Sequence, residues 1–269
     1  MPAVSVIIAA LDAHDTLGAA IDSVLAQDFS DFEIVIAPDE PADYSAFAAR
    51  DPRIRVIAGV PAPTGPGPAR NRALAAAQGD WIALLDADDL WSRDYLGALT
   101  RAAAPVGAAF GRTSVLEEND RELRSIPPQN YRGRVNFQVF ARAFGSFHGI
   151  TRRIPGRHWR DLFAEDVLFD METLSLVGGE APYVREAVYT LRSRAKSATR
   201  SRAFIDKIGW HYQTLVALID EGRTMIGSAH RAEASAVFES WAAMNASFLQ
   251  ASAAQPGLRY QNYIFSLKL

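Results

Sequence analysis

The chain has 269 residues, a formal net charge of -3 and no cysteine. Its length allows one large domain or two closely joined halves, and its hydrophobic fraction of 49% and charged fraction of 22% are ordinary for a soluble globular protein. The missing cysteines exclude a disulfide scaffold, a thiolate metal site and a cysteine nucleophile, and the net charge provides no overall basic field for nucleic acid.

The sequence shows no segment suited to crossing a membrane. No apolar run approaches the ~20 residues that a bilayer span needs. The N-terminus enters an apolar strand pattern at once, without a basic region before it, so we expect no signal peptide. We therefore expect a cytoplasmic protein whose membrane contact would be peripheral.

The first hundred residues alternate between strand-like and helix-like patterns. Apolar, partly β-branched runs predict strands over residues 4–10, 32–37, 54–57 and 81–85. Apolar spacing predicts a helix over 17–25, with Asp15 or Thr16 as its N-cap, and a second helix over 68–78. This alternation predicts a parallel sheet with helices on both faces.

Acidic residues follow three of these predicted strands. Asp12, Asp39 and the group at 86–89 each stand where a strand should end. Ligands of such sheets bind beyond the carboxyl ends of the strands. We therefore expect these acids to lie along one rim of the sheet.

The acidic group is the most informative part of the chain. Asp86, Asp88 and Asp89 stand within four positions, although clustered carboxylates repel one another and resist burial. Asp86 and Asp88 would point to the same side of an extended backbone, which suits a divalent cation carrying a diphosphate. The alternative is a turn or a helix N-cap, with Asp89 capping a helix over residues 90–99.

Beyond residue 101 the pattern is less regular. We expect strands over 106–110, 113–116 and 183–191, a break at the two prolines of 126–128, and helices over 165–177, 203–221 and 229–254.

Five blocks in order carry a resemblance to a known family. They are residues 4–8 (VSVII), 32–39 (FEIVIAPD), 67–74 (GPARNRAL), 79–89 (GDWIALLDADD) and 165–166 (ED). Together they resemble the inverting family 2 glycosyltransferases of the GT-A fold, over about residues 3 to 200. Two positions depart from the family: Ala9-Ala10 replaces a proline after the first strand, and Pro38-Asp39 replaces a pair of aspartates after the second.

The resemblance implies an α/β GT-A fold with a mostly parallel central sheet flanked by helices. Residues 1–202 would form the catalytic domain, with a nucleotide-sugar-binding half over 1–100 and an acceptor half over 101–202. Residues 203–269 would form a helical C-terminal extension. The extension would pack on the sheet, form a homodimer or help to hold an acceptor, and the sequence leaves these three roles open.

The resemblance also implies a reaction. A sugar would pass, with inversion, from a nucleoside diphosphate, expected to be UDP, to a hydroxyl of a saccharide or lipid-linked acceptor. Related bacterial enzymes often build surface polysaccharides, which suggests a place at the inner membrane face.

On the donor side, the resemblance gives roles to four residues. Asp39 would bind the base, Asp86 would lie near ribose and metal, and Asp88 would be the direct ligand of Mg²⁺ or Mn²⁺. Arg70 would reach the nucleotide or its phosphates; the alternative for Arg70 is a solvated helix face, which is also the role expected of Arg72.

On the acceptor side, the resemblance makes Asp166 the general base, with Glu165 as an orienting neighbour. The alternative is that both acids only favour the first turn of their helix. His148 is a further acceptor-side candidate, whereas Trp91 and Trp159 are expected in the core.

A basic segment over 192–202 could close over the bound donor. Arg194, Lys196 and Ser197 would grip the diphosphate there and exclude water. The alternative is a solvated basic loop. The segment has no interleaved aromatic residues, so we expect no nucleic-acid binding.

Three other classes of protein compete with this interpretation. A nucleotidyltransferase would carry glycines after the first strand, where residues 9–14 (AALDAH) have none, and a dehydrogenase would need a Gly-x-Gly-x-x-Gly motif. A degenerate transferase domain that only binds or scaffolds is favoured by the acid missing beside Asp39. The retained Asp86, Asp88 and Asp166 count against that third class.

Overall fold

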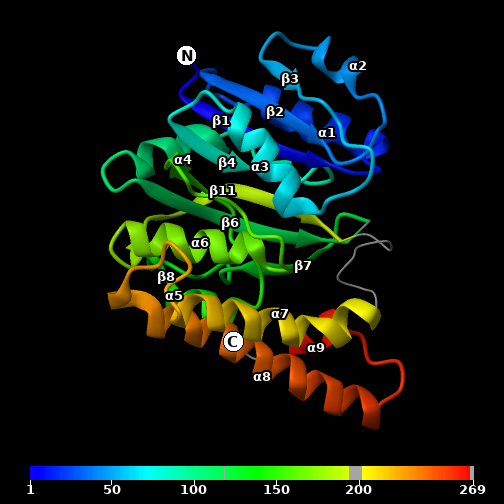
Figure 1. The fold of residues 1–269 in the computed structure, drawn as a ribbon, viewed down its shortest axis with the longest axis vertical. Helices are drawn as coiled ribbons and strands as arrows, with labels where there is room; N and C mark the ends of the chain where they lie inside the picture. Colours follow the sequence, from blue (N-terminus) through cyan, green and yellow to red (C-terminus); the bar gives the residue numbers. More distant parts are fainter. Residues whose placement is uncertain (118, 194–201, 267–269) are drawn as a thin grey trace.

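A nine-stranded mixed sheet forms the centre of the part of the chain that this computed structural model describes, residues 1–117, 119–193 and 202–266. The strand order is β3-β2-β1-β4-β9-β6-β11-β5, with β7 paired to β6 (Figure 1). The strands are β1 Val4–Ala10, β2 Phe32–Pro38, β3 Ile54–Val56, β4 Trp81–Leu84, β5 Leu90–Trp91, β6 Ala108–Leu116, β7 Glu122–Ile126, β9 Gly149–Arg152 and β11 Tyr183–Arg192. Two further strands, β8 Val135–Asn136 and β10 Glu180–Ala181, pair with each other.

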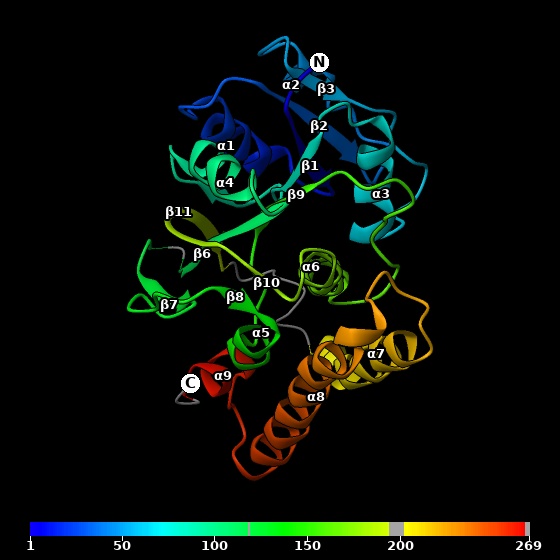
Figure 2. The same ribbon diagram turned by 90° about the vertical axis from the view of Figure 1, so that its left-hand side faces the viewer.

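The first half of the sheet is parallel and covered on both faces, as predicted. Val4 of β1 lies opposite Phe32 of β2 and Trp81 of β4, and all three strands run in the same direction. Helices α1 (His14–Leu25) and α4 (Tyr95–Ala103) pack on one face, and α3 (Pro66–Ala76) on the other (Figure 2). Because both faces are covered, the residues of β1 and β2 can be apolar on both sides.

The second half of the sheet mixes strand directions. β9 is antiparallel to β4 and β6, whereas β6 and β11 are parallel. The two strands expected over 106–110 and 113–116 are one strand, β6. Gly111 lies inside this strand. A Cβ at this position would stand 2.5 Å from the carbonyl oxygen of Ala187 on β11, so the absence of a side chain permits the close approach of the two strands.

The remaining helices lie in two places: one contacts β3, and the others follow β8 along the chain. They are α2 Ser45–Ala48, α5 Phe137–Ala143, α6 Glu165–Leu176, α7 Arg202–Asp220, α8 Arg231–Ala254 and α9 Tyr260–Ser266, with a short 3-10 turn over Ser228–His230. α7 packs on α8, and α8 packs on α5, away from β1, β2 and β4 (Figures 1 and 2). None of the helices described is both long enough and apolar enough to cross a membrane.

The predicted start of α1 was wrong, and so was the alternative in which Asp89 caps a helix. α1 begins at His14 with Ala13 at its N-cap, and Thr16, predicted as a cap, donates its hydroxyl to the Ala87 carbonyl at 2.8 Å. The helix expected over 90–99 is preceded by β5 and begins at Tyr95, so Asp89 caps no helix. Both differences arise because polar side chains near the acidic group bond to distant parts of the chain.

Candidate active site

The ends of β1, β2 and β4 bring the predicted acids to one rim of the sheet. Asp39 follows β2, and its backbone N–H donates to the Ala10 carbonyl at the end of β1 at 2.7 Å. The backbone N–H of Asp12 donates to Glu40 at 2.7 Å. The parallel register therefore places acids from separate parts of the sequence on the same side of the sheet, as expected.

Arg70 joins the acidic residues that follow β4 to the start of α6. Its guanidinium donates to the Asp86 carboxylate at 2.6 Å and also to Glu165, in the first turn of α6. Only 5% of Arg70 is exposed, so the alternative of a solvated helix face is wrong. Three elements, α3, the end of β4 and α6, meet at this one side chain.

The two carboxylates respond differently to that contact. Burial raises the pKa of Asp86, but the charge and hydrogen bond of Arg70 outweigh it and hold that pKa below its usual value. Burial raises the pKa of Glu165 to about 8, against the lowering effect of Arg70. Arg70 therefore stabilises the charged form of Asp86 more completely than that of Glu165.

Residues 86–89 form an acidic turn, and Asp89 holds this turn against β11. Its carboxylate accepts from the Tyr189 hydroxyl and from the Arg192 backbone N–H, both at 2.8 Å. It is 3% exposed, and burial together with the charges of Asp86 and Asp88 raises its pKa well above the usual value. Asp89 is therefore a structural tether in this geometry, while Asp86 and Asp88 remain half-buried at the rim.

The carboxylates at this rim suit a cation that arrives with a diphosphate. No group of three or more His, Asp or Glu side chains among the described residues forms a ready-made metal cage. Mg²⁺ usually takes only one or two protein carboxylates and completes its shell with phosphate oxygens and water. Asp86 and Asp88 fit that requirement.

Asp39 is held by the loop that precedes α3. Its carboxylate accepts from the Thr64 hydroxyl at 2.6 Å and from the backbone N–H groups of Thr64 and Gly65 at 2.9 and 2.8 Å. Burial raises its pKa, but these donors bring it below the usual value. Asp39 is 2% exposed, so its predicted contact with a nucleotide base would require these bonds to rearrange.

Arg72 also reaches this carboxylate. Its guanidinium lies 3.4 Å from Asp39 and donates to the Pro38 carbonyl at 2.7 Å. The helix face expected for Arg72 holds in part: 26% of its side chain is exposed, but its ion-pair partner is the buried Asp39. Of the two arginines on α3, Arg72 serves Asp39 and Arg70 serves Asp86.

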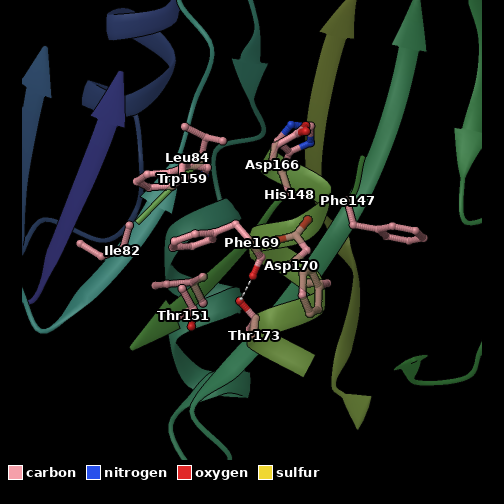
Figure 3. Close-up of a pocket in the computed structure, with 13 residues that line it drawn as sticks. Ile82, Leu84, Phe147, His148, Thr151, Trp159, Asp166, Phe169, Asp170 and Thr173 are labelled. Carbon is pink, nitrogen blue, oxygen red and sulfur yellow. Dashed lines mark hydrogen bonds between the residues drawn. The ribbon is translucent and has the colours of Figure 1, made fainter. Parts of the chain in front are cut away.

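Asp166 stands at the start of α6 beside a small buried cavity. The Ser146 hydroxyl donates to Oδ2 of Asp166. The cavity, about 20 Å³, has room for about one water molecule. Figure 3 shows it between α6, which carries Asp166, Phe169, Asp170 and Thr173, and strands that carry Ile82, Leu84 and Thr151. Burial and the charge of Asp166 raise the pKa of Asp170 well above its usual value.

His148 is close enough to both Asp86 and Asp166 for their charges to act on its ring. Its ring stacks on Tyr189 with centroids 3.5 Å apart, and its Nδ1 is 3.4 Å from the Thr113 hydroxyl. Burial lowers the pKa of His148 to about 4, although Asp86 and Asp166 oppose this. His148 is therefore neutral near pH 7.

The other predicted site residues fall into two groups. Arg194, Lys196 and Ser197 lie outside the described residues. Trp91 and Trp159 are 6% and 2% exposed, and the core position expected of them is confirmed. No sequence pattern points to Ser146 or Tyr189, because their partners lie 20 and 100 residues away along the chain.

Comparison with known proteins supports the resemblance to family 2 glycosyltransferases. The profile described as Glycosyl transferase family 2 matches residues 5–156, more than half of the chain. The Succinoglycan biosynthesis protein ExoO of Rhizobium meliloti is 39% identical over 129 residues, which are 46% of this chain and 37% of that protein. The Escherichia coli UDP-Glc:alpha-D-GlcNAc-diphosphoundecaprenol beta-1,3-glucosyltransferase WfgD is 37% identical over 131 residues, 47% of this chain and 51% of that protein. The chain thus spans between about a third and a half of these two relatives.

Solved structures share the fold. The structure of S. aureus TarS 1-349 in complex with UDP-GlcNAc superposes with a TM-score of 0.72 at 18% identity, covering 98% of this chain and 78% of that one. The mannosyltransferase PcManGT from Pyrobaculum calidifontis, in complex with GDP-Man and Mn2+, gives a TM-score of 0.57 at 19% identity, covering 96% and 76%. The fold is therefore GT-A, and this chain belongs to glycosyl transferase family 2.

Proposed function

We propose that this chain is a metal-dependent, inverting glycosyltransferase of polysaccharide biosynthesis. It moves a sugar from a nucleoside diphosphate, with UDP the first choice, to a hydroxyl of a saccharide or lipid-linked acceptor. One observation carries the proposal: buried Arg70 joins Asp86, on the donor side, to Glu165, which immediately precedes Asp166. This contact keeps a cation-binding edge and a proton acceptor at one site.

The reaction is a single displacement at the anomeric carbon. Asp166 takes the proton of the acceptor hydroxyl while its oxygen forms the new glycosidic bond, and the bond between the anomeric carbon and the diphosphate oxygen breaks. Asp86 and Asp88 would hold Mg²⁺ or Mn²⁺, which supplies charge stabilisation for the leaving diphosphate when bound. Because one face of the carbon is attacked as the other is vacated, the configuration inverts.

The names of relatives support the choice of substrates. WfgD is described as acting with UDP-Glc on a diphosphoundecaprenol-linked sugar, and TarS was crystallised with UDP-GlcNAc. We therefore propose a diphosphate-lipid-linked saccharide as acceptor. Such an acceptor would bring the protein to the inner membrane face, where flotation with vesicles that contain the lipid would detect it.

The proposed division of the chain is a catalytic domain over residues 1–202 and a helical extension over residues 203–269.

The test is release of the nucleoside diphosphate in the presence of Mn²⁺. UDP-glucose, UDP-GlcNAc and GDP-mannose are supplied in turn, first with water as acceptor. We expect Asp88→Asn to lower turnover at least 100-fold, since its oxygens no longer stabilise the cation and leaving group. The matched control is Asp80→Asn, which removes an exposed carboxylate just before the opposite end of β4 and should keep wild-type turnover.

The outcomes separate the competing classes. Equal turnover by wild type and Asp88→Asn with metal present contradicts the metal role. Calorimetry that detects neither UDP nor Mn²⁺ binding favours the scaffold class. Release of pyrophosphate from a nucleoside triphosphate favours a nucleotidyltransferase.

A further inference from the structure

We propose that Ser146 is a positioning residue for the base Asp166: its hydroxyl holds Oδ2, so that Oδ1 faces the acceptor hydroxyl. The inference deepens the proposed function and rests on the role proposed there for Asp166. Ser146 lies between α5 and β9, 20 residues before its partner, in a segment that no sequence motif marks.

Ser146 is itself fixed by the sheet. The hydroxyl of Thr113, on β6, donates to the Ser146 carbonyl at 3.2 Å, and Thr113 is fully buried. The same hydroxyl lies 3.4 Å from Nδ1 of His148, whose ring stacks on Tyr189. The serine therefore presents its hydroxyl from a backbone that is tied to a buried strand, as an orienting group should.

The surroundings of Asp166 explain why orientation needs support. Among the described residues, the groups on which the charge of Asp166 acts include Glu165 and Asp170 on α6, Arg70 on α3, His148 beside β9 and Tyr212 on α7. Asp86, after β4, acts together with Asp166 on Arg70 and His148. Arg70 donates to Asp86 and Glu165, so its described bonds go to those two acids. A neutral donor at Oδ2 fixes the carboxylate of Asp166 without a full opposing charge, which leaves it able to accept a proton.

The main experiment compares Ser146→Ala with wild type, using release of the nucleoside diphosphate from the donor selected above, with Mn²⁺. We expect kcat to fall about tenfold or more, because a misplaced base loses rate steeply, while KM for the donor stays the same. The acid limb of the kcat–pH profile should move to higher pH by about half a unit, since the charged carboxylate has lost a donor. Ser146→Thr, which keeps a hydroxyl, should restore both.

A control and a double variant make the test specific. Ser240→Ala removes a hydroxyl on α8 that donates to the Ala141 carbonyl, and it should leave kcat and the acid limb unchanged. In an Asp166→Asn background, Ser146→Ala should change the residual rate by less than about twofold, because its effect passes through Asp166.

The two proposals fail in different ways. If Asp166→Asn keeps full turnover, the proposed base is wrong. If Asp166→Asn is inactive but Ser146→Ala keeps wild-type kcat and an unmoved acid limb, the positioning role alone is overturned. Circular dichroism at each pH gives the folded fraction of the variant, and kcat divided by that fraction reports the acid limb without any contribution from acid unfolding.

Discussion

Arg70 occupies a position where one buried cation serves two carboxylates from different elements. Its contacts with Asp86 and Glu165 fix the distance between the end of β4 and the start of α6. Removing one member of such a group leaves a buried charge without its partner, which is costly in a low-dielectric interior. The sequence analysis singled out Arg70 for the donor, but the structure shows that it also determines the geometry of the site through these two acids.

His148 gives a residue-scale prediction about pH. The unfolded chain binds a proton there below about pH 6.5, whereas the folded protein does so only near pH 4. Between these values the unfolded state binds more protons, so the free energy of unfolding falls as the pH is lowered through this window. The variant His148→Phe keeps the ring stack on Tyr189 but has no proton to bind. Between pH 6.5 and 4, the free energy of unfolding of wild type should therefore fall by up to about 3 kcal/mol more than that of His148→Phe.

Urea unfolding at several pH values measures this difference. The matched control is His158→Phe, which removes an exposed histidine. Its free energy of unfolding should decrease on acidification as much as that of wild type. Identical pH dependence of wild type and His148→Phe would show that His148 is not buried in its neutral form.

At the scale of elements, the approach of α3 to the segment before α6 assembles the site. Gly67, in the first turn of α3, permits this approach, because a Cβ there would lie 2.2 Å from the Arg160 carbonyl oxygen and 3.4 Å from Cγ of Glu165. The Asn71 side chain adds two bonds to the backbone of Trp159, at 2.7 and 2.8 Å. These contacts fix the position of α3 relative to the segment before α6, at the point where Arg70 contacts Glu165.

Gly67→Ala tests this approach. The new methyl group must push α3 away from the backbone of Arg160, so we expect a loss of about 1–3 kcal/mol in the free energy of unfolding and a fall in donor turnover. Gly18→Ala, on α1, is the control: its Cβ would have 3.6 Å to the nearest atom, and it should be neutral or stabilising by up to about 1 kcal/mol. A fully active, equally stable Gly67→Ala protein would contradict the close packing.

At the scale of the whole molecule, the C-terminal helices share a core with α5, α6 and β6. Phe238 is fully buried among residues of α5, α6 and β6, and the Trp241 indole donates to the Phe140 carbonyl at 3.2 Å. Tyr212 of α7 is buried close enough to Asp166 for that charge to contribute to its raised pKa, after burial and Tyr260. The helices therefore pack beside Asp166, which favours a supporting role over an independent module.

Phe238→Ala should show that the helices and the site unfold together. The cavity left behind should lower the free energy of unfolding by about 3–5 kcal/mol, and turnover should be lost at the same lowered urea concentration as the helical circular-dichroism signal. Trp210→Ala, at a side chain that is 60% exposed on α7, should change stability by less than about 0.5 kcal/mol. Turnover that survives unfolding of the helices would instead support an independent extension.

The sequence by itself determined the strands and helices with strong periodicity and the rim where the acids gather. These follow from local spacing and from the direction of parallel strands, so the sequence alone was enough to place Asp39 and Asp86 at that rim. Tertiary structure decided which partner each acid has: Arg72 for Asp39, Arg70 for Asp86, Tyr189 for Asp89 and Ser146 for Asp166. The rotation of a helix and the approach of remote segments depend on packing over the whole core, and no local pattern encodes them.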